Sequence, residues 1–326
     1  MTVCRICSAD ADHQLFTVLE MQFGTREPFV YFECSSCKCL QLRDVPKNSL
    51  NYYPENYYSF NTIKGLPSRA FFSSIKRLGR RAIVNYRLGS RVFPGRLLEM
   101  QFGSGFIPHW LLKSGLKISP DSKILDVGSG SGDNLIKLES IGFTNLLGID
   151  PFISSDTTYA NGVKVLKLSL ESLNDSFDFI MLHHSFEHME HQLSVLKKVN
   201  SLLRQDCYAL IRIPIKSYAW ERYQTNWAQI DAPRHVCLHT PSSIRLLASQ
   251  AGFEVLDMVF DSDEFQFWGS EQYAKDIPLI AADSYAVNPA QSMFSEEDIK
   301  SFRKKASELN RDCQGDQACI YLQKTL

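Results

Sequence analysis

The sequence has neither a long apolar run nor an excess of charge of one sign. No stretch approaches the ~20 apolar residues that a membrane-spanning helix needs, and residues 1–7 lack the apolar core of a secretion signal. The formal net charge is −1, so no overall field attracts the chain to nucleic acid or acidic lipid. We therefore expect a cytoplasmic protein.

A disulfide framework is not expected either, because the nine cysteines are odd in number and follow no secretion signal. Five of them fall within the first 39 residues. There, Cys4-x-x-Cys7 and Cys34-x-x-Cys37 match the two knuckles of a structural zinc ribbon. Zinc can replace the core that so short a segment cannot build, and idle buried cysteines are the alternative. We predict structural Zn²⁺ on these four thiols in a zinc-ribbon-like segment, residues 1–60, with Cys39 as a spectator or a replacement for Cys37.

The next segment is basic. Residues 61–98 carry nine basic side chains and no acidic one, interleaved with apolar residues at helical spacing. We predict a basic helical connector or cap over residues 61–119. Two roles stay open for residues 61–98: contact with an anionic membrane surface, or a connector whose arginines are solvated or paired with acidic groups of the next domain. We prefer the connector.

From about residue 120, short apolar runs alternate with helical patterns. The runs predict buried strands at residues 123–128, 145–150, 163–168, 177–182, 208–213, 253–260 and 318–322. Helices are expected at 193–203, 240–252 and near 295–310. Such alternation builds a doubly wound sheet. We therefore predict an α/β protein whose Rossmann-like, mostly parallel sheet occupies residues 120–326, behind a small zinc-ribbon-like segment.

A glycine loop, Asp126-Val-Gly-Ser-Gly-Ser-Gly132, follows the first of these strands and opens a helix. Glycines let the backbone approach a ligand, and the helix N-terminus supplies N–H donors and partial positive charge. The dinucleotide fingerprint would need glycine at position 133, which is Asp133, and this disfavours an NAD-dependent oxidoreductase. The second strand ends in Asp150, whose two oxygens can accept both hydroxyls of a ribose. An ordinary tight turn and a surface acid are the alternatives, but the two features lie on consecutive strands.

These motifs, together with Phe177–Met189 on the fourth strand, resemble class I S-adenosylmethionine-dependent methyltransferases over roughly residues 120–260. The resemblance implies that the loop glycines at 128, 130 and 132 pack against the methionine part of the donor, with Asp126 beside it and Asp150 on the ribose. The family usually has an acid near position 169 for the adenine amino group. Serine stands there instead, so we expect Glu171 to substitute and Leu170 to bracket the adenine.

The whole chain is similar to methyltransferases of bacterial polysaccharide and secondary-metabolite clusters. These join two cysteine pairs to a tyrosine-rich stretch, here Tyr52-Tyr-Pro and Tyr57-Tyr-Ser, and then to a class I domain. The resemblance implies methylation of a small molecule or a sugar or glycan intermediate, and we expect O-methylation. The acceptor molecule, the acceptor atom and the oligomeric state are not predicted.

Histidines gather where the acceptor would bind. Four of the eight lie between His183 and His191, and two more, His235 and His239, follow the fifth strand. Both loops leave the carboxyl ends of strands, where doubly wound sheets bind ligands. Histidine suits proton removal from a hydroxyl near neutral pH. We predict the general base among His188, His235 and His184, in that order; a hydrogen-bonded structural histidine is the alternative for each.

Two other functions stay open. A nucleic-acid (RNA) methyltransferase would use the zinc segment and the basic connector for binding. However, base-amino methylases usually carry an Asn/Asp-Pro-Pro-aromatic motif where this chain has His-His-Ser-Phe at 183–186, and the chain is neutral overall. A non-enzymatic partner protein is disfavoured by the intact glycine loop and Asp150. We therefore expect no nucleic-acid partner.

Overall fold

The computed structural model describes residues 2–48, 52–53, 71–90, 93–113 and 115–325. The chain divides into two compact units. Unit 1 comprises residues 1–54, 186–196 and 212–321, and unit 2 comprises residues 55–185, 197–211 and 322–326. Among the described residues, no helix is both long and apolar enough to cross a membrane.

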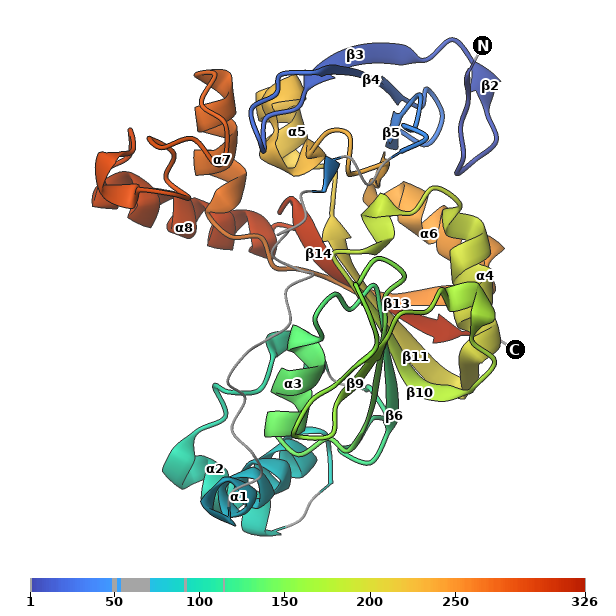
Figure 1. Cartoon of the computed structure of the whole chain (residues 1–326), viewed down its shortest axis with the longest axis vertical. Coiled ribbons are helices and arrows are strands. Elements are labelled where there is room, and N and C mark those ends of the chain that lie inside the picture. The colour runs from blue at the N-terminus through green and yellow to red at the C-terminus, as the bar shows by residue number, and fades with distance from the viewer. Residues whose placement is uncertain (1, 49–51, 54–70, 91–92, 114, 326) are drawn as a thin grey trace. The chain divides into compact units, whose positions relative to one another are not determined.

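Parallel strands form the centre of unit 2 (Figure 1). β10 (Phe177–His183), β6 (Lys123–Val127), β7 (Asn145–Ile149) and β9 (Lys164–Leu166) pair in this order and in parallel, and β8 (Thr157–Thr158) joins β9 antiparallel. Each parallel strand is a short apolar run, as strands covered on both faces require. Helix α3 (Asp133–Ser140) follows β6 directly and packs against β7.

The complete sheet has eight strands in the order β13-β14-β11-β10-β6-β7-β9-β8. Its remaining members are β11 (Leu203–Pro214), β14 (Gln317–Lys324) and β13 (Phe253–Phe260). The prediction of a mostly parallel, Rossmann-like sheet is confirmed. One difference is local: β11 begins at Leu203, where helix α4 (Gln192–Leu202) ends, five residues earlier than the apolar run at 208–213 predicts.

The described part of the basic connector contains two α-helices. Helices α1 (Phe71–Arg87) and α2 (Phe93–Phe102) lie side by side in unit 2 (Figure 1). Three of its arginines make ion pairs: Arg77 with Glu139 at 2.9 Å, Arg81 with Asp121 at 2.5 Å, and Arg87 with Glu99. Residues 61–70 and the Tyr57-Tyr-Ser stretch lie outside the described residues.

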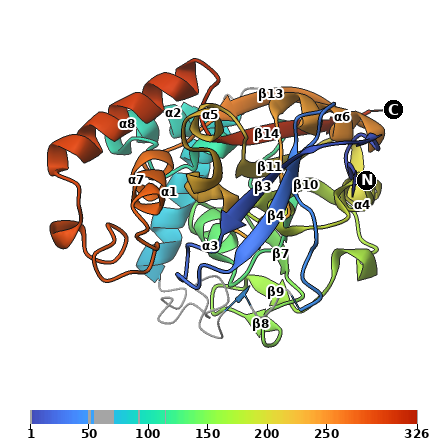
Figure 2. The same ribbon diagram turned by 90° about the horizontal axis from the view of Figure 1, so that it is seen from above.

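Unit 1 contains a four-stranded antiparallel sheet of order β12-β5-β4-β3. Figure 2 shows its long strands, β3 (Gln14–Leu19) and β4 (Pro28–Glu33), in blue. β5 (Leu40–Leu42) pairs with β4, and β12 (Cys237–Leu238) pairs with β5. A two-stranded hairpin, β1 (Thr2–Val3) with β2 (Asp10–Ala11), precedes them.

Residues far apart in the sequence share the core of unit 1. Tyr31 and Leu40 from the first 54 residues pack with Trp220, Trp227 and Leu238. The unit's helices are α5 (Tyr218–Tyr223), α6 (Pro241–Gln250), α7 (Phe265–Ala274) and α8 (Glu296–Arg311).

Short 3-10 helices occur in both units: η3 (His109–Leu111), η4 (Leu170–Ser172), η5 (Phe186–His188), η6 (Gln224–Asn226), η7 (Ala228–Ile230) and η8 (Pro289–Gln291).

Candidate functional site

The glycine loop of unit 2 adopts a conformation that side chains would prevent. Gly132 is the left-handed N-cap of α3 with φ +89°, and a Cβ there would lie 2.8 Å from Val165 Cγ2. Gly128 has φ +70°, and its Cβ would lie 2.5 Å from Ser185 Cβ. Any side chain at either position would be strained and would clash. The loop therefore places backbone N–H groups and the start of α3 at the carboxyl end of β6.

Two buried carboxyl groups lie beside this loop. Asp150 Oδ2 accepts a hydrogen bond from Gly130 N at 3.0 Å, and its Oδ1 accepts one from Phe152 N at 2.8 Å. Asp126 is 1% exposed, and burial together with the charge of Asp150 raises its pKa well above the usual range. Asp126 Oδ2 has no hydrogen-bond partner among the described residues. A buried polar atom without a partner in the protein leaves room for a hydrogen bond to a ligand or an ordered water.

The two remaining predicted donor contacts differ in exposure. Leu170, in η4, is buried, whereas Glu171 is exposed to solvent. Sequence reasoning missed Trp110, whose ring lies 4.7 Å from that of His183 at the end of β10. The next residue after His183, His184, is exposed and has φ +49°, a left-handed value that is uncommon for a residue with a side chain.

The four predicted zinc ligands come together in unit 1. Their sulfur atoms all lie within 4.8 Å of one another, with Cys4 Sγ 3.6 Å from Cys37 Sγ and Cys7 Sγ 3.5 Å from Cys34 Sγ. Gln41 Nε2 donates to Cys4 Sγ at 3.0 Å. The contact with Cys37 and these donors lower the pKa of the Cys4 thiol, which favours the thiolate that a metal binds.

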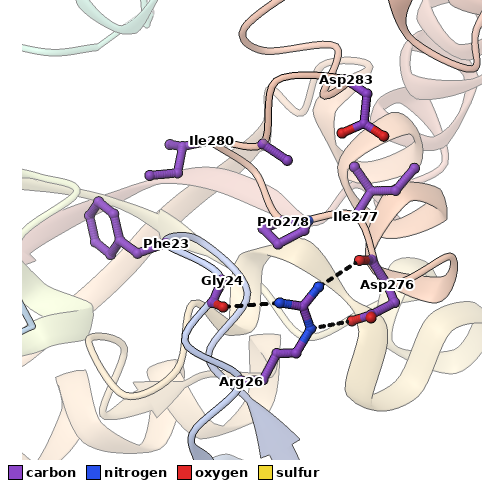
Figure 3. A pocket seen from close by; sticks show the side chains of 9 residues that line it. Phe23, Gly24, Arg26, Asp276, Ile277, Pro278, Ile280 and Asp283 are labelled. Carbon is purple, nitrogen blue, oxygen red and sulfur yellow. Dashed lines mark hydrogen bonds and ion pairs between the residues drawn. The ribbon is translucent and has the colours of Figure 1, made fainter.

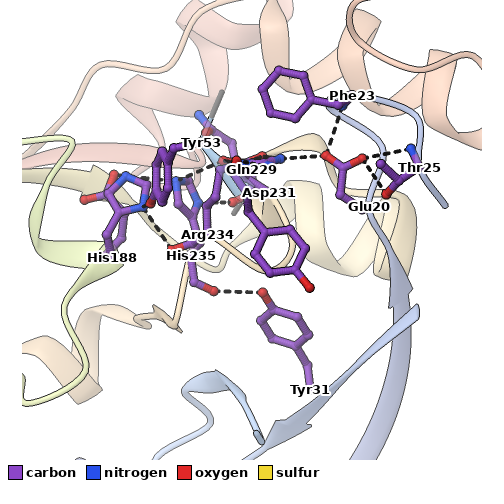
Figure 4. Close-up of polar contacts among 12 residues, drawn as sticks. Glu20, Phe23, Thr25, Tyr31, Tyr53, His188, Gln229, Asp231, Arg234 and His235 are labelled. Atoms are coloured by element: carbon purple, nitrogen blue, oxygen red, sulfur yellow. Dashed lines mark hydrogen bonds and ion pairs between the residues drawn. The ribbon is translucent and has the colours of Figure 1, made fainter. Parts of the chain in front are cut away.

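A buried arginine organises the loop that carries His235 (Figure 4). The Arg234 guanidinium donates to Asp231 at 2.5–3.0 Å and to Glu20 Oε1 at 2.9 Å, and it lies 4.9 Å from the ring centroid of Phe23. Burial alone would raise the pKa of Asp231, but the attraction of Arg234 outweighs it and lowers the pKa. Glu20 and Phe23 belong to the N-terminal segment, so that segment helps to build this loop.

The structure brings His188 and His235 together, with ring centroids 4.7 Å apart. His235 Nδ1 lies 2.7 Å from Gln229 O, and His188 Nδ1 lies 2.9 Å from Arg234 O and 3.0 Å from the Tyr53 hydroxyl. A carbonyl only accepts, so each Nδ1 carries the proton and each Nε2 presents a lone pair. Burial and His188 lower the pKa of His235 to about 4. With Glu187, the same two rings could also hold a cation.

An open pocket of about 470 Å³ lies in unit 1 between the loop of Phe23 and the segment 276–283 (Figure 3). Arg26 lines this pocket and donates hydrogen bonds to Asp276 Oδ1 at 2.7 Å and to Gly24 O at 3.1 Å. The ring of Phe23 contributes to this pocket as well as to the Arg234 contact.

Residues 100–258 match the model of a family described as "Methyltransferase domain". The prediction of an S-adenosylmethionine-dependent methyltransferase is confirmed by this match. No curated protein matches the chain.

Solved structures resemble the chain only distantly. A cyclopropane synthase from Mycobacterium tuberculosis is 18% identical with a TM-score of 0.41, over 64% of this chain and 80% of that one. Magnesium protoporphyrin IX methyltransferase from Synechocystis PCC 6803, solved with bound SAH, is 12% identical with a TM-score of 0.39, over 80% and 90%. Similarity at this level assigns no substrate.

Proposed function

We propose that this chain transfers a methyl group from S-adenosylmethionine to a hydroxyl of a small molecule or a sugar or glycan intermediate. The observation that carries the donor assignment is the pair of buried carboxyl groups beside a glycine loop in unit 2. Asp126 Oδ2 is orphaned among the described residues, and Asp150 holds the loop through Gly130 N. When bound, the donor supplies a methyl group on a sulfonium.

The chain's own residues would bind and orient that donor. Asp126 offers a buried negative charge to the cationic methionine part, which would in turn favour the ionised carboxylate. Asp150 offers acceptor positions to the ribose hydroxyls, since two carboxylate oxygens carry about four lone-pair sites. Gly128, Gly130 and Gly132 allow close approach of the backbone. We assign Leu170 and Glu171 to the adenine end, with Glu171 as the weaker contributor because it is exposed.

For the proton, we propose His188 as the general base, ahead of His235 and His184. Nε2 of His188 presents a lone pair, because Nδ1 is committed to Arg234 O. His235 has the same arrangement, but its pKa of about 4 makes it a weak base near neutral pH. His184 is exposed just after β10 and ranks third.

We also propose that Cys4, Cys7, Cys34 and Cys37 hold one structural Zn²⁺. Four sulfur atoms leave no open coordination position, so this ion would stabilise unit 1 rather than act on substrate. The paired arginines of α1 favour the connector role for residues 61–98 over membrane contact. A cytoplasmic location and a place in polysaccharide biosynthesis stay predictions from the sequence.

The acceptor class is tested by incubating the full chain with methyl-labelled S-adenosylmethionine and three acceptor pools: nucleotide sugars and glycan fragments, amine-bearing small molecules, and RNA. We expect label in an O-methyl group of the first pool. Label only in amines or RNA would contradict the acceptor assignment and leave the donor assignment standing. Donor turnover that is insensitive to a chelator would exclude a catalytic cation at Glu187, His188 and His235.

A further inference from the structure

A second group of metal-ligating side chains lies in unit 1, outside the four-cysteine cluster. Cys39 Sγ is 3.1 Å from Cys237 Sγ, and Cys237 Sγ is 3.8 Å from His239 Nε2. The three ligand atoms all lie within 4.8 Å of one another. The side chains are almost fully buried, with exposed fractions of 0%, 2% and 0%. Neither the donor site nor the proposed proton transfer uses them.

Strand pairing explains why these residues meet. In the antiparallel pair of β5 and β12, Leu238 is opposite Leu40 and Cys237 is opposite Gln41. Side chains alternate between the faces of a strand. Leu40 and Leu238 therefore point together into the hydrophobic core, where both are found. The residues that flank them in sequence, Cys39, Cys237 and His239, consequently share the opposite face.

His239 is held in a way that allows it to bind a metal. Its Nδ1 is 2.9 Å from Ser243 Oγ, which also lies 3.1 Å from Thr240 O. A hydroxyl can donate or accept, so Ser243 can accept from Nδ1–H while donating to Thr240 O. Without a metal, His239 Nε2 donates its proton to Gln192 Oε1 at 2.9 Å, since an amide oxygen only accepts. In the tautomer with the proton on Nδ1, Nε2 presents its lone pair toward Cys237 Sγ, and Gln192 Oε1 offers a fourth ligand atom beside it.

We propose that Cys39, Cys237 and His239 bind a second Zn²⁺ ion. Binding releases the two thiol protons, so two thiolates and a neutral imidazole surround the divalent cation and the site has no net charge. Neutrality matters in a buried place, because an uncompensated charge there is costly. A monovalent thiophilic ion such as Cu⁺ would leave one negative charge. The four-cysteine site differs, since Cys7 and Cys37 are partly exposed and can carry the excess charge.

This ion would join β5 of the N-terminal segment to β12, two residues beyond His235 in sequence. Its role would be to fix the loop that carries His235, in addition to the backbone bond from Leu42 N to Val236 O at 2.9 Å. The inference does not depend on the acceptor or on methyl transfer.

The test is the zinc content of the purified full chain, measured by elemental analysis after removal of loose metal. We expect two ions per chain. Cys237→Ser and His239→Gln should each retain one ion, Cys4→Ser should also retain one, and Cys313→Ser, which changes an exposed cysteine outside both clusters, should retain two. After cobalt substitution, Cys237→Ser should show weaker thiolate-to-metal absorption than the wild-type chain, because a site with two thiolates is lost. Cys4→Ser should show a larger decrease, because a site with four thiolates is lost.

The wild-type count keeps the proposal falsifiable even if a variant fails to fold. The proposal would be overturned if the wild-type chain, prepared under reducing conditions, held one ion and Cys4→Ser held none. A mass two units lower than the reduced chain, with Cys39 and Cys237 joined in one peptide, would overturn it as well, because the pair would then be a disulfide.

Discussion

Unit 2 and unit 1 differ in the range of the contacts that build their candidate sites. In unit 2, the donor residues lie just after consecutive strands, and a hydrogen bond joins Gly130 to Asp150, which follow the neighbouring strands β6 and β7. In unit 1, Arg234 binds Glu20, and His188 binds Tyr53, across more than a hundred residues of chain. A site built from local motifs can be recognised in a sequence, whereas one built from distant segments cannot.

The difference also assigns the N-terminal segment a second task. Besides four cysteines, it contributes Glu20, Phe23 and Tyr53 to the surroundings of Arg234 and His188. Zinc in that segment would therefore support the loop of His235 as well as its own fold. If the two units have these separate roles, substitutions in unit 1 should leave donor binding in unit 2 largely intact.

The largest effect is expected at His188. His188→Ala should lower turnover by about 10²–10⁴-fold, the usual cost of losing a general base, while donor affinity stays nearly constant. Steady-state rates with an identified acceptor, together with donor titration, measure both. The matched control is His191→Ala, which removes an exposed histidine of the same loop. Full turnover in both variants would make His188 a structural residue and would break the proposed division of roles.

Removal of zinc should affect unit 1 and spare unit 2. Cys4→Ser or Cys34→Ser should release the ion of the four-cysteine site and lower stability by several kcal/mol, as loss of a structural metal does. Donor binding should be largely retained. Metal analysis, thermal unfolding and donor titration on the same samples provide the comparison. A metal-free wild-type chain with a folded N-terminal segment would refute the zinc site.

His235 should make the stability of unit 1 depend on pH. Its folded-state pKa of about 4 lies below the unfolded value of about 6.5. The unfolded state therefore binds the proton more readily, so the free energy of unfolding is highest above pH 6.5 and falls as pH drops toward 4, by up to roughly 3 kcal/mol. Denaturant unfolding at several pH values measures the slope. His235→Asn should flatten it, and an unchanged slope would show that other groups cause it.

The smallest effect is expected at Asp126, where the direction of the change in stability is the informative result. The pKa of this carboxyl is raised in the folded state, so its ionisation opposes folding as pH rises above its usual value of about 3.8. Asp126→Asn should therefore be more stable than wild type at neutral pH, because it removes a buried ionisable carboxyl, yet bind the donor less well. A variant that is less stable and binds equally well would remove Asp126 from the donor site.

Much of the fold could be predicted from the sequence, because short apolar strands and capped helices have local signals. Thr240 illustrates this: it caps α6 as its sequence context predicts, accepting from Ser243 N at 3.1 Å. Glu20 had no such signal, since nothing near it in sequence shows that a buried arginine more than two hundred residues away needs its carboxylate. Likewise, Cys237 and His239 meet Cys39 only through the register of β5 and β12.

The central claim is that unit 2 binds S-adenosylmethionine through the glycine loop and Asp150. Calorimetric titration of the wild-type chain and of Asp150→Ala with S-adenosylmethionine tests it most directly. Two ribose hydrogen bonds to a charged group contribute roughly 1.5–3 kcal/mol each, so the variant should bind at least ~100-fold more weakly, with S-adenosylhomocysteine affected equally. Unchanged affinity in a folded Asp150→Ala variant, or tight binding of NAD to the wild-type chain, would contradict the account.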